Sequence, residues 1–301
     1  MFNTKLLFIV NLTAGQKRIH KKLPDVLQIF CKNGYLPTVM TTLYQGHARE
    51  LAAGHAADYD VIVCAGGDGT LSETIQGLMD AGLDKPLGYI PCGTTNDLAS
   101  TLGLSKEADR AAEDIVSGTA CPIDVGIFNG KIFAYTASFG AFTRASYATP
   151  QTLKNTLGHL AYLLEGIKDL TNLQPISAHV KTENEEFDGK YVFGSISNST
   201  SLGGVLTLDK SLVLLDDGKF ELMLMESPQN AIELSQLLIN LTQRRFEPPI
   251  HMIAAKHIEI TTTQPIDWTL DGECMKGDVT FTVENLHKAV KIILPGAKTE
   301  E

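Results

Sequence analysis

The stretch with the clearest chemistry in this sequence is a glycine-rich loop that carries one carboxylate, Gly66-Gly67-Asp68-Gly69-Thr70. It follows five apolar residues, Val61–Ala65, which predict a buried strand, and it precedes apolar residues at helical spacing. A turn between a strand and a helix presents backbone N–H groups, and the helix dipole adds to their attraction for anions. The loop therefore predicts a phosphate-binding site.

The carboxylate of Asp68 distinguishes this loop from a simple phosphate cradle. A carboxylate is repelled by phosphate by about 1–4 kcal/mol per charge pair at about 4 Å. A divalent cation reverses that sign, so Asp68 predicts phosphate together with Mg²⁺. The loop contains no lysine of the P-loop type, and Ser72 stands where the dinucleotide-binding pattern has its third glycine.

The first part of the chain alternates strand and helix patterns. Apolar runs predict strands at Leu6–Val10, Thr38–Thr42, Val61–Ala65 and Leu87–Pro91, with helices between them. This alternation predicts a parallel sheet covered by helices, in which ligands sit at the carboxyl ends of the strands. The loops at Asn11, Gly66 and Gly93 all lie at such ends, so one site could use all three.

The pattern changes near Ile123 to short strand-like runs, among them 132–138, 279–283 and 290–294, separated by turn residues such as those at Asp271-Gly272. Helical spacing interrupts them at about 153–170 and 230–241. We therefore predict an α/β domain at 1–123 and a mainly antiparallel β domain at 124–301, with a tail at about 285–301 that can pack back on the first domain.

Composition narrows the function classes. The 301 residues carry a net charge of −10, which argues against a general nucleic-acid binder and requires any attraction to an anionic membrane to be local. The five cysteines lack paired spacing, and no apolar run reaches the length of a signal or membrane-spanning segment. These features predict a cytoplasmic protein with reduced thiols.

Three motifs together carry a family resemblance. Gly66–Thr70 is followed by Glu73 and Gly77, then by Pro91-Cys-Gly-Thr-Thr-Asn-Asp97, and much later by Asp271-Gly-Glu273. This order and spacing resemble the diacylglycerol kinase catalytic-domain family, in its branch of bacterial soluble lipid kinases. Sphingosine kinases are similar, and NAD kinases and phosphofructokinases more distantly so. The resemblance covers nearly the whole chain, although Leu12 stands where the family usually has proline.

The resemblance implies an ATP-dependent lipid kinase of phospholipid metabolism, with ATP as cosubstrate and Mg²⁺ as the metal. Diacylglycerol is the first candidate substrate, giving phosphatidic acid, and phosphatidylglycerol and sphingoid lipids are alternatives. The implied fold is an N-terminal α/β domain with a parallel sheet, as in NAD kinase and phosphofructokinase, and a C-terminal antiparallel β domain, with the active site in the cleft between them.

Residue roles follow from the matched motifs. Asp68 would hold the catalytic Mg²⁺, Asp271 would accept the proton of the lipid hydroxyl, and Glu273 would support the metal or the base. Asp97 and Asp124 would form a polar network with Asn96. A structural Mg²⁺ or Ca²⁺ would bind the Asp217 carboxylate and the carbonyls of Leu214 and Lys219. The implied nucleotide-binding set is Asn11, Thr41, Thr42, Gly66, Gly67, Asp68, Gly69, Thr70, Leu71, Ser72, Gly93, Thr94 and Asn96.

Simpler interpretations accompany these roles. The glycine loop alone could be a tight turn, Asp97 alone a carboxylate at a helix N-terminus, and Asp271 or Asp217 alone a turn residue before glycine. An NAD kinase-like enzyme and a non-catalytic nucleotide- or lipid-binding protein remain as alternative functions.

The predicted partner is a lipid at a membrane surface, reached by peripheral contact, with no nucleic acid and with a monomer or homodimer as the assembly. Basic residues crowd the start of the first predicted helix, and they could contact phosphate head groups or form a solvated face. They are Lys17, Arg18, Lys21 and Lys22.

Overall fold

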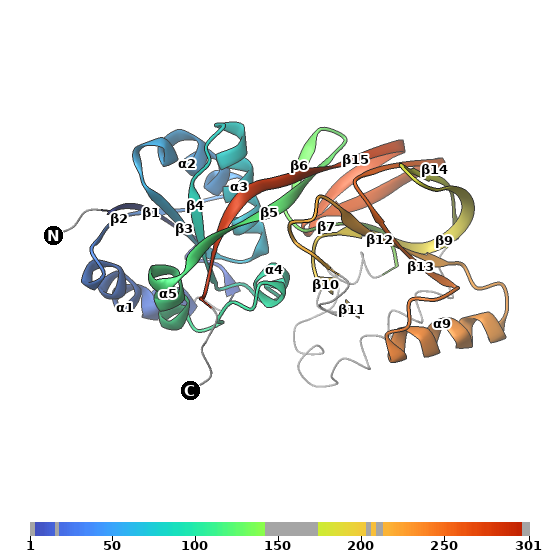
Figure 1. Cartoon of the computed structure of the whole chain (residues 1–301), viewed down its shortest axis with the longest axis horizontal. Coiled ribbons are helices and arrows are strands. Elements are labelled where there is room, and N and C mark those ends of the chain that lie inside the picture. Colours follow the sequence, from blue (N-terminus) through green and yellow to red (C-terminus); the bar gives the residue numbers. More distant parts are fainter. Residues whose placement is uncertain (1–3, 16–17, 142–173, 203–205, 209–212, 297–301) are drawn as a thin grey trace. The chain divides into compact units, whose positions relative to one another are not determined.

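The computed structural model describes residues 4–15, 18–141, 174–202, 206–208 and 213–296, which form two compact units (Figure 1). The first unit contains the described residues up to Asp124 and those from Lys288 onward, and the second contains those from Val125 to His287. The division falls beside the predicted boundary at 123–124. The first unit also takes the end of the C-terminal segment that the sequence allowed to pack back on it.

Four parallel strands form the sheet of the first unit, in the spatial order β4-β3-β1-β2. The strands are β1 (Thr4–Val10), β2 (Tyr35–Thr41), β3 (Val61–Gly66) and β4 (Pro86–Pro91). The last residues of a long later strand, β15 (Glu273–Leu294), pair in parallel with β4. The apolar runs of β1 and β3 are buried throughout, as expected for strands that are covered on both faces.

Helices cover both faces of this sheet (Figure 1). Helix α1 (Arg18–Lys32) packs with α5 (Ala108–Ser117), and α2 (His47–His55) packs with α3 (Asp68–Asp80) on the opposite face. Phe8 of β1 and Phe30 of α1 meet edge to face in the core beneath α1. Two short helices, η2 (Ala56–Asp58) and α4 (Asp97–Thr101), complete the unit.

The described strand pairs of the second unit are antiparallel. One helix, α9 (Ala231–Gln243), covers part of one sheet face through Leu237 and Leu241. The strands, besides β15, are β5 (Thr119–Phe128), β6 (Lys131–Phe133), β7 (Thr136–Gly140), β8 (Ile176–Thr182), β9 (Glu186–Ser197), β10 (Ser201–Leu202), β11 (Leu206–Thr207), β12 (Phe220–Glu226), β13 (Ile250–Ala255) and β14 (His257–Leu270). The predicted fold class, an α/β part followed by a mainly antiparallel β part, is confirmed.

An aromatic cluster centres the core of the second unit. The ring of Trp268 lies 4.6 Å from that of Phe128, 4.8 Å from that of Phe139 and 5.3 Å from that of Phe281, measured between ring centroids. Aromatic pairs of this kind contribute about 0.5–1.5 kcal/mol each beyond their buried area. The cluster therefore fixes the end of β14, which carries Asp271.

Several element predictions need correction in detail. The run 132–138 is not one strand, because the backbone N–H groups between β6 and β7 bind the Asp271 carboxylate instead of a neighbouring strand. The runs 279–283 and 290–294 belong to the single strand β15. The helix predicted at 230–241 is confirmed as α9, and the one predicted at 153–170 lies outside the described residues.

Candidate active site

A cavity of about 410 Å³ lies in the first unit, at the carboxyl ends of its strands. The loops that follow β1, β2, β3 and β4 all contribute to it, as expected for a parallel sheet. The predicted nucleotide-binding residues that line it are Asn11, Thr42, Gly67, Gly69, Thr70 and Gly93. The residues that line it without having been predicted are Thr13, Ala14, Gly15, Leu43, Tyr44, Gln45 and Glu73.

The loops approach one another so closely that side chains would not fit between them. A Cβ atom on Gly93 would lie 2.5 Å from the Cα atom of Gly67. A Cβ atom on Gly15, whose φ is +30°, would lie 2.3 Å from the carbonyl oxygen of Cys92. Glycine at these positions lets three backbones converge, and converging backbones can present their N–H groups to a phosphate chain.

Side-chain hydrogen bonds fix the loops in this arrangement. Asn96 accepts the N–H of Gly93 at 2.9 Å and donates to the carbonyl of the same residue at 2.9 Å. Asn11 donates through Nδ2 to the Thr70 hydroxyl at 3.1 Å, which joins the loop after β1 to helix α3. The predicted residues Asn11 and Asn96 therefore hold the loops together within the unit.

Two carboxylates begin the helices that face this region. Asp68 is the first residue of α3 and is half-buried, and Asp97 is the first residue of α4 and is 3% exposed. Burial raises the pKa of the Tyr89 phenol well above its usual value, and the negative charges of Asp68 and Asp97 raise it further. The charges of both carboxylates therefore act on the buried Tyr89 hydroxyl.

Tyr89 is a site residue that sequence reasoning missed, because it lies within the apolar run of β4. Its hydroxyl lies 3.2 Å from Oδ1 of Asn96 and 3.3 Å from the carbonyl oxygen of Gly66. It therefore links the loop after β3 to the loop after β4. Only the side-chain register of β4 could have shown that its hydroxyl points toward the site.

Glu73 is a second contributor whose role sequence reasoning missed, although it was part of the recognised motif. Its carboxylate accepts the N–H groups of Gly46 at 2.8 Å and Ala48 at 3.2 Å, at the N-terminus of α2. These bonds satisfy N–H groups that have no partner within the helix. Glu73 thereby fixes the loop between β2 and α2, which forms one wall of the cavity.

An exposed aromatic side chain stands on that wall. Tyr44 is 56% exposed, and its ring stacks on that of His47 with centroids 4.6 Å apart and planes 20° apart. Its hydroxyl donates to Glu50 at 2.7 Å. Nδ1 of His47 accepts the N–H of Leu43 at 3.1 Å, so the ring pair is held in place from both ends.

The remaining predicted residues of the first unit do not line the cavity. Thr41 ends β2 with an exposed side chain, whereas the neighbouring Thr42 lines the cavity. Asp124 is fully buried and accepts the N–H of Lys288 at 2.7 Å, which fastens β15 to β5. The others are Gly66, Leu71, Ser72 and Thr94.

Asp271 and Glu273 belong to the second unit, at the hairpin that joins β14 to β15. Asp271 and Gly272 form the two-residue turn, with φ values of +48° and +91°. Asp271 is 6% exposed, and its carboxylate accepts the N–H groups of Ala134, Tyr135 and Thr136. Glu273 is exposed at the start of β15. The buried carboxylate therefore holds the turn, and the exposed one lies beside it.

The predicted structural metal site has the geometry of a turn. The Asp217 carboxylate accepts the N–H of Lys219 at 2.9 Å, and Gly218 has a φ of +82°. The carbonyl of Lys219 accepts Nδ2 of Asn285 at 3.1 Å, and the side chain of Leu214 is 56% exposed. An aspartate that binds the N–H two residues on is typical of Asp-Gly turns. Metal binding there stays a prediction.

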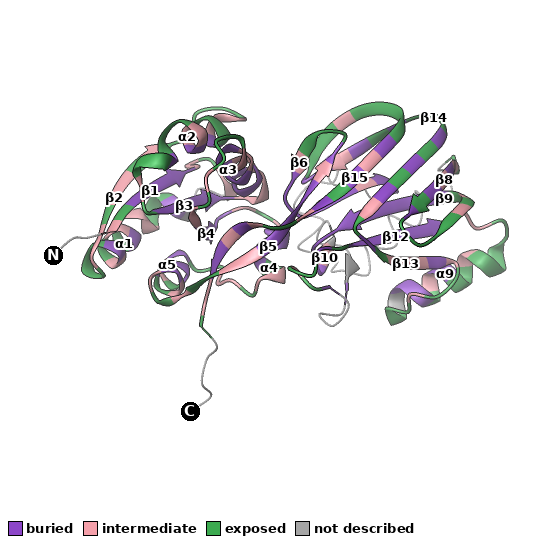
Figure 2. Ribbon diagram, turned by 45° about the horizontal axis from the view of Figure 1, so that its top comes forward, coloured by how far each residue is buried: buried purple, intermediate pink, exposed green. Residues whose placement is uncertain are grey.

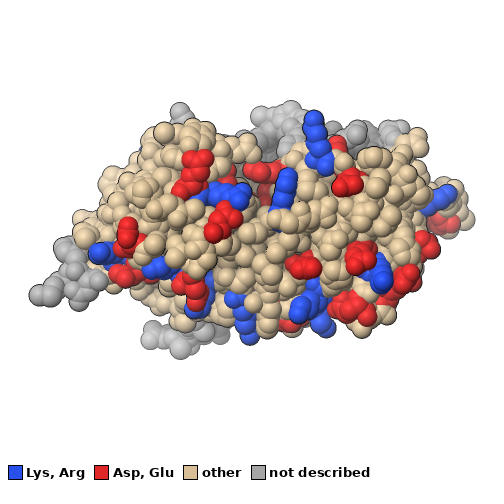
Figure 3. All heavy atoms as spheres, turned by 90° about the horizontal axis from the view of Figure 1, so that it is seen from above, with Lys and Arg blue, Asp and Glu red and all other residues tan. Residues whose placement is uncertain are grey.

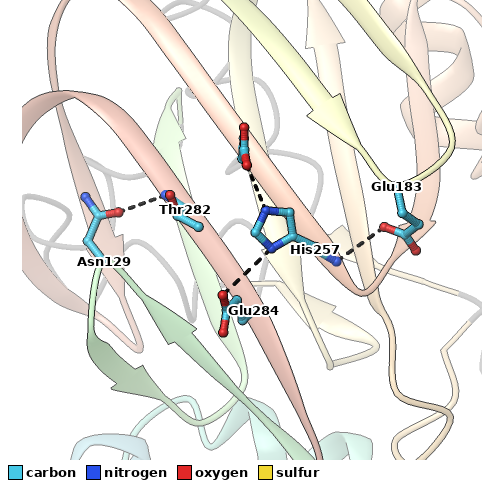
Figure 4. Close-up of polar contacts among 6 residues, drawn as sticks. Asn129, Glu183, His257, Thr282 and Glu284 are labelled. Atoms are coloured by element: carbon cyan, nitrogen blue, oxygen red, sulfur yellow. Dashed lines mark hydrogen bonds and ion pairs between the residues drawn. The ribbon is translucent and has the colours of Figure 1, made fainter.

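Histidine side chains of the second unit contact carboxylates. His257 lies 3.0 Å from Glu259 and 4.0 Å from Glu284, and Glu183 accepts its backbone N–H at 3.3 Å (Figure 4). The hydrogen bond from His257 lowers the pKa of Glu259. Within the described ranges, no group of three or more His, Cys, Asp or Glu side chains is arranged to hold a metal ion.

Comparison with known proteins covers both units. Residues 5–128 match the model of the diacylglycerol kinase catalytic domain, and residues 136–294 match that of the YegS C-terminal NAD kinase beta sandwich-like domain. The chain is 33% identical over 299 residues to diacylglycerol kinase of Bacillus subtilis (strain 168), with 97% of each chain covered. It is 31% identical over 297 residues to diacylglycerol kinase of Staphylococcus saprophyticus, with 97% and 96% covered.

Among solved structures, the chain is also similar to proteins described as diacylglycerol kinases. A crystal structure of a candidate diacylglycerol kinase from Bacillus anthracis str. Sterne aligns with a TM-score of 0.83 at 26% identity, covering 99% of this chain and 97% of that one. A second structure from the same organism, with a TM-score of 0.78 at 22% identity and 98% coverage of each chain, shows the likeness of fold. None of the helices in the described part of the chain has both the length and the apolar character needed to cross a bilayer.

Proposed function

Because the chain belongs to the diacylglycerol kinase catalytic-domain family, we propose that it is an ATP-dependent lipid kinase that phosphorylates diacylglycerol. The observation that carries the proposal is the glycine loop, whose Gly67 and Gly69 on either side of Asp68 line a cavity built from the strand ends. In the reaction, the lipid hydroxyl oxygen forms a bond to the γ-phosphorus of ATP and the bond to the bridging β–γ oxygen breaks. ADP leaves, and the hydroxyl proton passes to a carboxylate.

The test is ATP consumption with diacylglycerol in mixed micelles, with NAD, and with neither. We expect ATP to be consumed only when diacylglycerol is present, with formation of phosphatidic acid. Turnover with NAD would favour an NAD kinase-like enzyme, and nucleotide binding without turnover would favour a binding protein. A panel that adds phosphatidylglycerol and a sphingoid base assigns the lipid, because apolar pockets distinguish acyl chains only weakly.

The cavity of the first unit is our proposed nucleotide site. Its volume of about 410 Å³ is within the range of about 300–1,000 Å³ for small-molecule sites. The loops at Asn11, Gly67 and Gly93 would hold the phosphates through backbone N–H groups. The wall formed by Thr42 to Gln45 would hold the nucleoside, which extends the roles predicted for Thr41 and Thr42.

We predict that Tyr44 provides the stacking surface for the nucleobase, because its ring is exposed at the cavity wall and held by His47 and Glu50. Stacking of a base on an aromatic ring contributes about 1–3 kcal/mol, so Tyr44→Ala should raise the KM for ATP roughly tenfold. Steady-state kinetics with ATP as the varied substrate measures this. Tyr44→Phe is the matched control and should retain the KM, whereas an unchanged KM in Tyr44→Ala would remove the stacking role.

The donor set fits Mg²⁺ bound together with ATP. Asp68 and Asp97 bring two negative charges to bear on Tyr89, and Mg²⁺ in kinases is held by one or two carboxylates and the substrate phosphates. We propose that Asp68 holds the ion and that Asp97 and Asn96 maintain the loop beside it. When bound, the ion neutralises charge on the β- and γ-phosphates.

The environments of the two hairpin carboxylates favour Glu273, rather than Asp271, as the proton acceptor. The Asp271 oxygens already accept three backbone N–H groups in a buried turn, whereas Glu273 is exposed. A general base must reach the proton that it removes. We therefore propose Glu273 as the proton acceptor and Asp271 as the residue that positions the hairpin.

Peripheral membrane contact in the cytoplasm is the proposed route to the lipid. Figure 3 shows basic and acidic side chains interspersed on one face. The net charge is −10, so any attraction to an anionic membrane must come from a local basic surface. Of the basic cluster predicted for this contact, Lys17 lies outside the described residues, and the side chain of Arg18 is not described. Lys22 forms an ion pair with Asp109 at 2.9 Å, which neutralises part of the cluster.

The basic cluster is tested by changing Lys17, Arg18, Lys21 and Lys22 to Ser and measuring sedimentation with anionic vesicles. We expect weaker binding at low salt, because each basic residue near an anionic surface contributes about 1 kcal/mol. The Lys22–Asp109 pair reduces the expected loss. Binding equal to that of the unchanged protein would assign these residues to a solvated face.

A further inference from the structure

Helix α9 of the second unit presents apolar side chains outward as well as inward. Its inner side packs Leu237 and Leu241 against the sheet, and both are buried. Ile232 and Ile239 are 82% and 45% exposed. They are seven residues apart, so they lie on one side of the helix about 10 Å apart along its axis. These two isoleucines form a short apolar stripe on the outer side of the helix, the Ile232–Ile239 stripe. Figure 2 shows exposed residues along α9.

The start of the helix is firmly built, so this exposure is a fixed feature of the fold. Oδ1 of Asn230 accepts the N–H groups of Ile232 and Glu233 at 3.0 Å each. The Glu233 carboxylate accepts Nδ2 of Asn230 at 2.9 Å and the N–H of Gln229 at 2.6 Å. This reciprocal capping fixes the first turn of the helix, which carries the exposed Ile232.

A basic pair ends the same helix. Arg244 and Arg245 are exposed, and the ion pairs among the described residues do not include them. Arg244 is the C-cap with a φ of +53°, a conformation that favours glycine or asparagine. The next acidic residue along the chain is Glu247. The C-terminal end of α9 therefore carries two exposed positive charges.

We propose that α9 is a membrane-contact element of this protein, separate from the basic cluster at the start of α1, with the Ile232–Ile239 stripe in the interface of a bilayer and Arg244 and Arg245 on anionic lipid head groups. This proposal rests on the proposed lipid kinase function, since the substrate then resides in a membrane. An exposed apolar stripe that ends in a basic pair has the chemistry of a helix lying in a bilayer surface. In a chain of net charge −10, the arginines give this surface local charge complementarity to anionic lipid.

Two variants test the surface by sedimentation with vesicles of equimolar phosphatidylglycerol and phosphatidylcholine. Ile232→Gln/Ile239→Gln should lower partitioning about tenfold at every salt concentration, since it removes apolar burial. Arg244→Gln/Arg245→Gln should lower it about tenfold at low salt and reduce the salt dependence. The matched controls are Leu36→Thr/Val39→Thr, which replaces exposed apolar residues of β2, and Arg110→Gln on α5. Both should bind as the unchanged protein does.

Activity measurements separate this proposal from the proposed function. Both α9 variants should phosphorylate a monomeric short-chain diacylglycerol at the normal rate and vesicle-embedded diacylglycerol about tenfold more slowly. An unchanged protein that binds vesicles but phosphorylates neither substrate would refute the kinase function and leave the surface supported. Normal vesicle binding by the isoleucine variant would overturn the proposal, as would a self-association in sedimentation equilibrium that the isoleucine variant abolishes.

Discussion

Replacing Asp68 with alanine is expected to abolish kinase turnover while leaving the fold intact. Asp68 is the first residue of α3, in a loop whose backbone lies against Gly93. Without its carboxylate the loop would still approach the phosphates but would lose the group that we propose to hold Mg²⁺. Phosphoryl transfer depends on positioning and on stabilisation of charge, so the loss falls on the chemical step. Measurement of phosphatidic acid formation at saturating ATP gives the result.

A matched control lies at the other end of the same helix. Asp80 ends α3 and forms an ion pair with Arg49 on the surface. Exposed pairs contribute about 0–1 kcal/mol, so Asp80→Ala should keep full turnover and lose little stability. Circular dichroism during heating should place both variants near the unchanged protein. Normal turnover in Asp68→Ala would refute the metal role proposed for Asp68.

The sequence predicted the glycine loop well because the strand, the turn and the helix of that loop are contiguous. Val61–Ala65, the glycines and Asp68 interact within ten residues, and local pattern rules apply at that range. The same reasoning placed the loops of Asn11 and Gly93 at one sheet edge, where they line one cavity. Parallel topology supplied the long-range step, because it brings all strand ends together.

Contacts between distant residues were beyond the reach of pattern reasoning. Asp271 binds N–H groups more than 130 residues earlier in the chain, and these bonds separate β6 from β7. Glu73 binds the start of α2, a contact that depends on how two helices pack. The αL conformation of Arg244 contradicts the usual preference for glycine at that position. Each of these features is set by tertiary structure, which overrides local propensity.

The second large effect on turnover is expected when a carboxylate of the β14–β15 hairpin is replaced. Glu273→Gln is expected to lower kcat roughly 10²–10⁴-fold, because a positioned general base contributes that much and glutamine cannot accept the proton. The KM for ATP should change little, since the proposed nucleotide site lies in the other unit. Thermal stability should also be retained, because Glu273 is exposed.

Asp271→Asn should behave differently, because its amide offers one acceptor oxygen where the carboxylate offers two. At least one buried N–H of residues 134–136 then loses its partner, which costs about 1–3 kcal/mol and lowers the melting temperature. Turnover should fall as the hairpin that carries Glu273 shifts. Melting temperature and turnover together distinguish a positioning role from a proton-accepting role. A stable Asp271→Asn variant with a 10²–10⁴-fold loss, beside a fully active Glu273→Gln variant, would return the base role to Asp271.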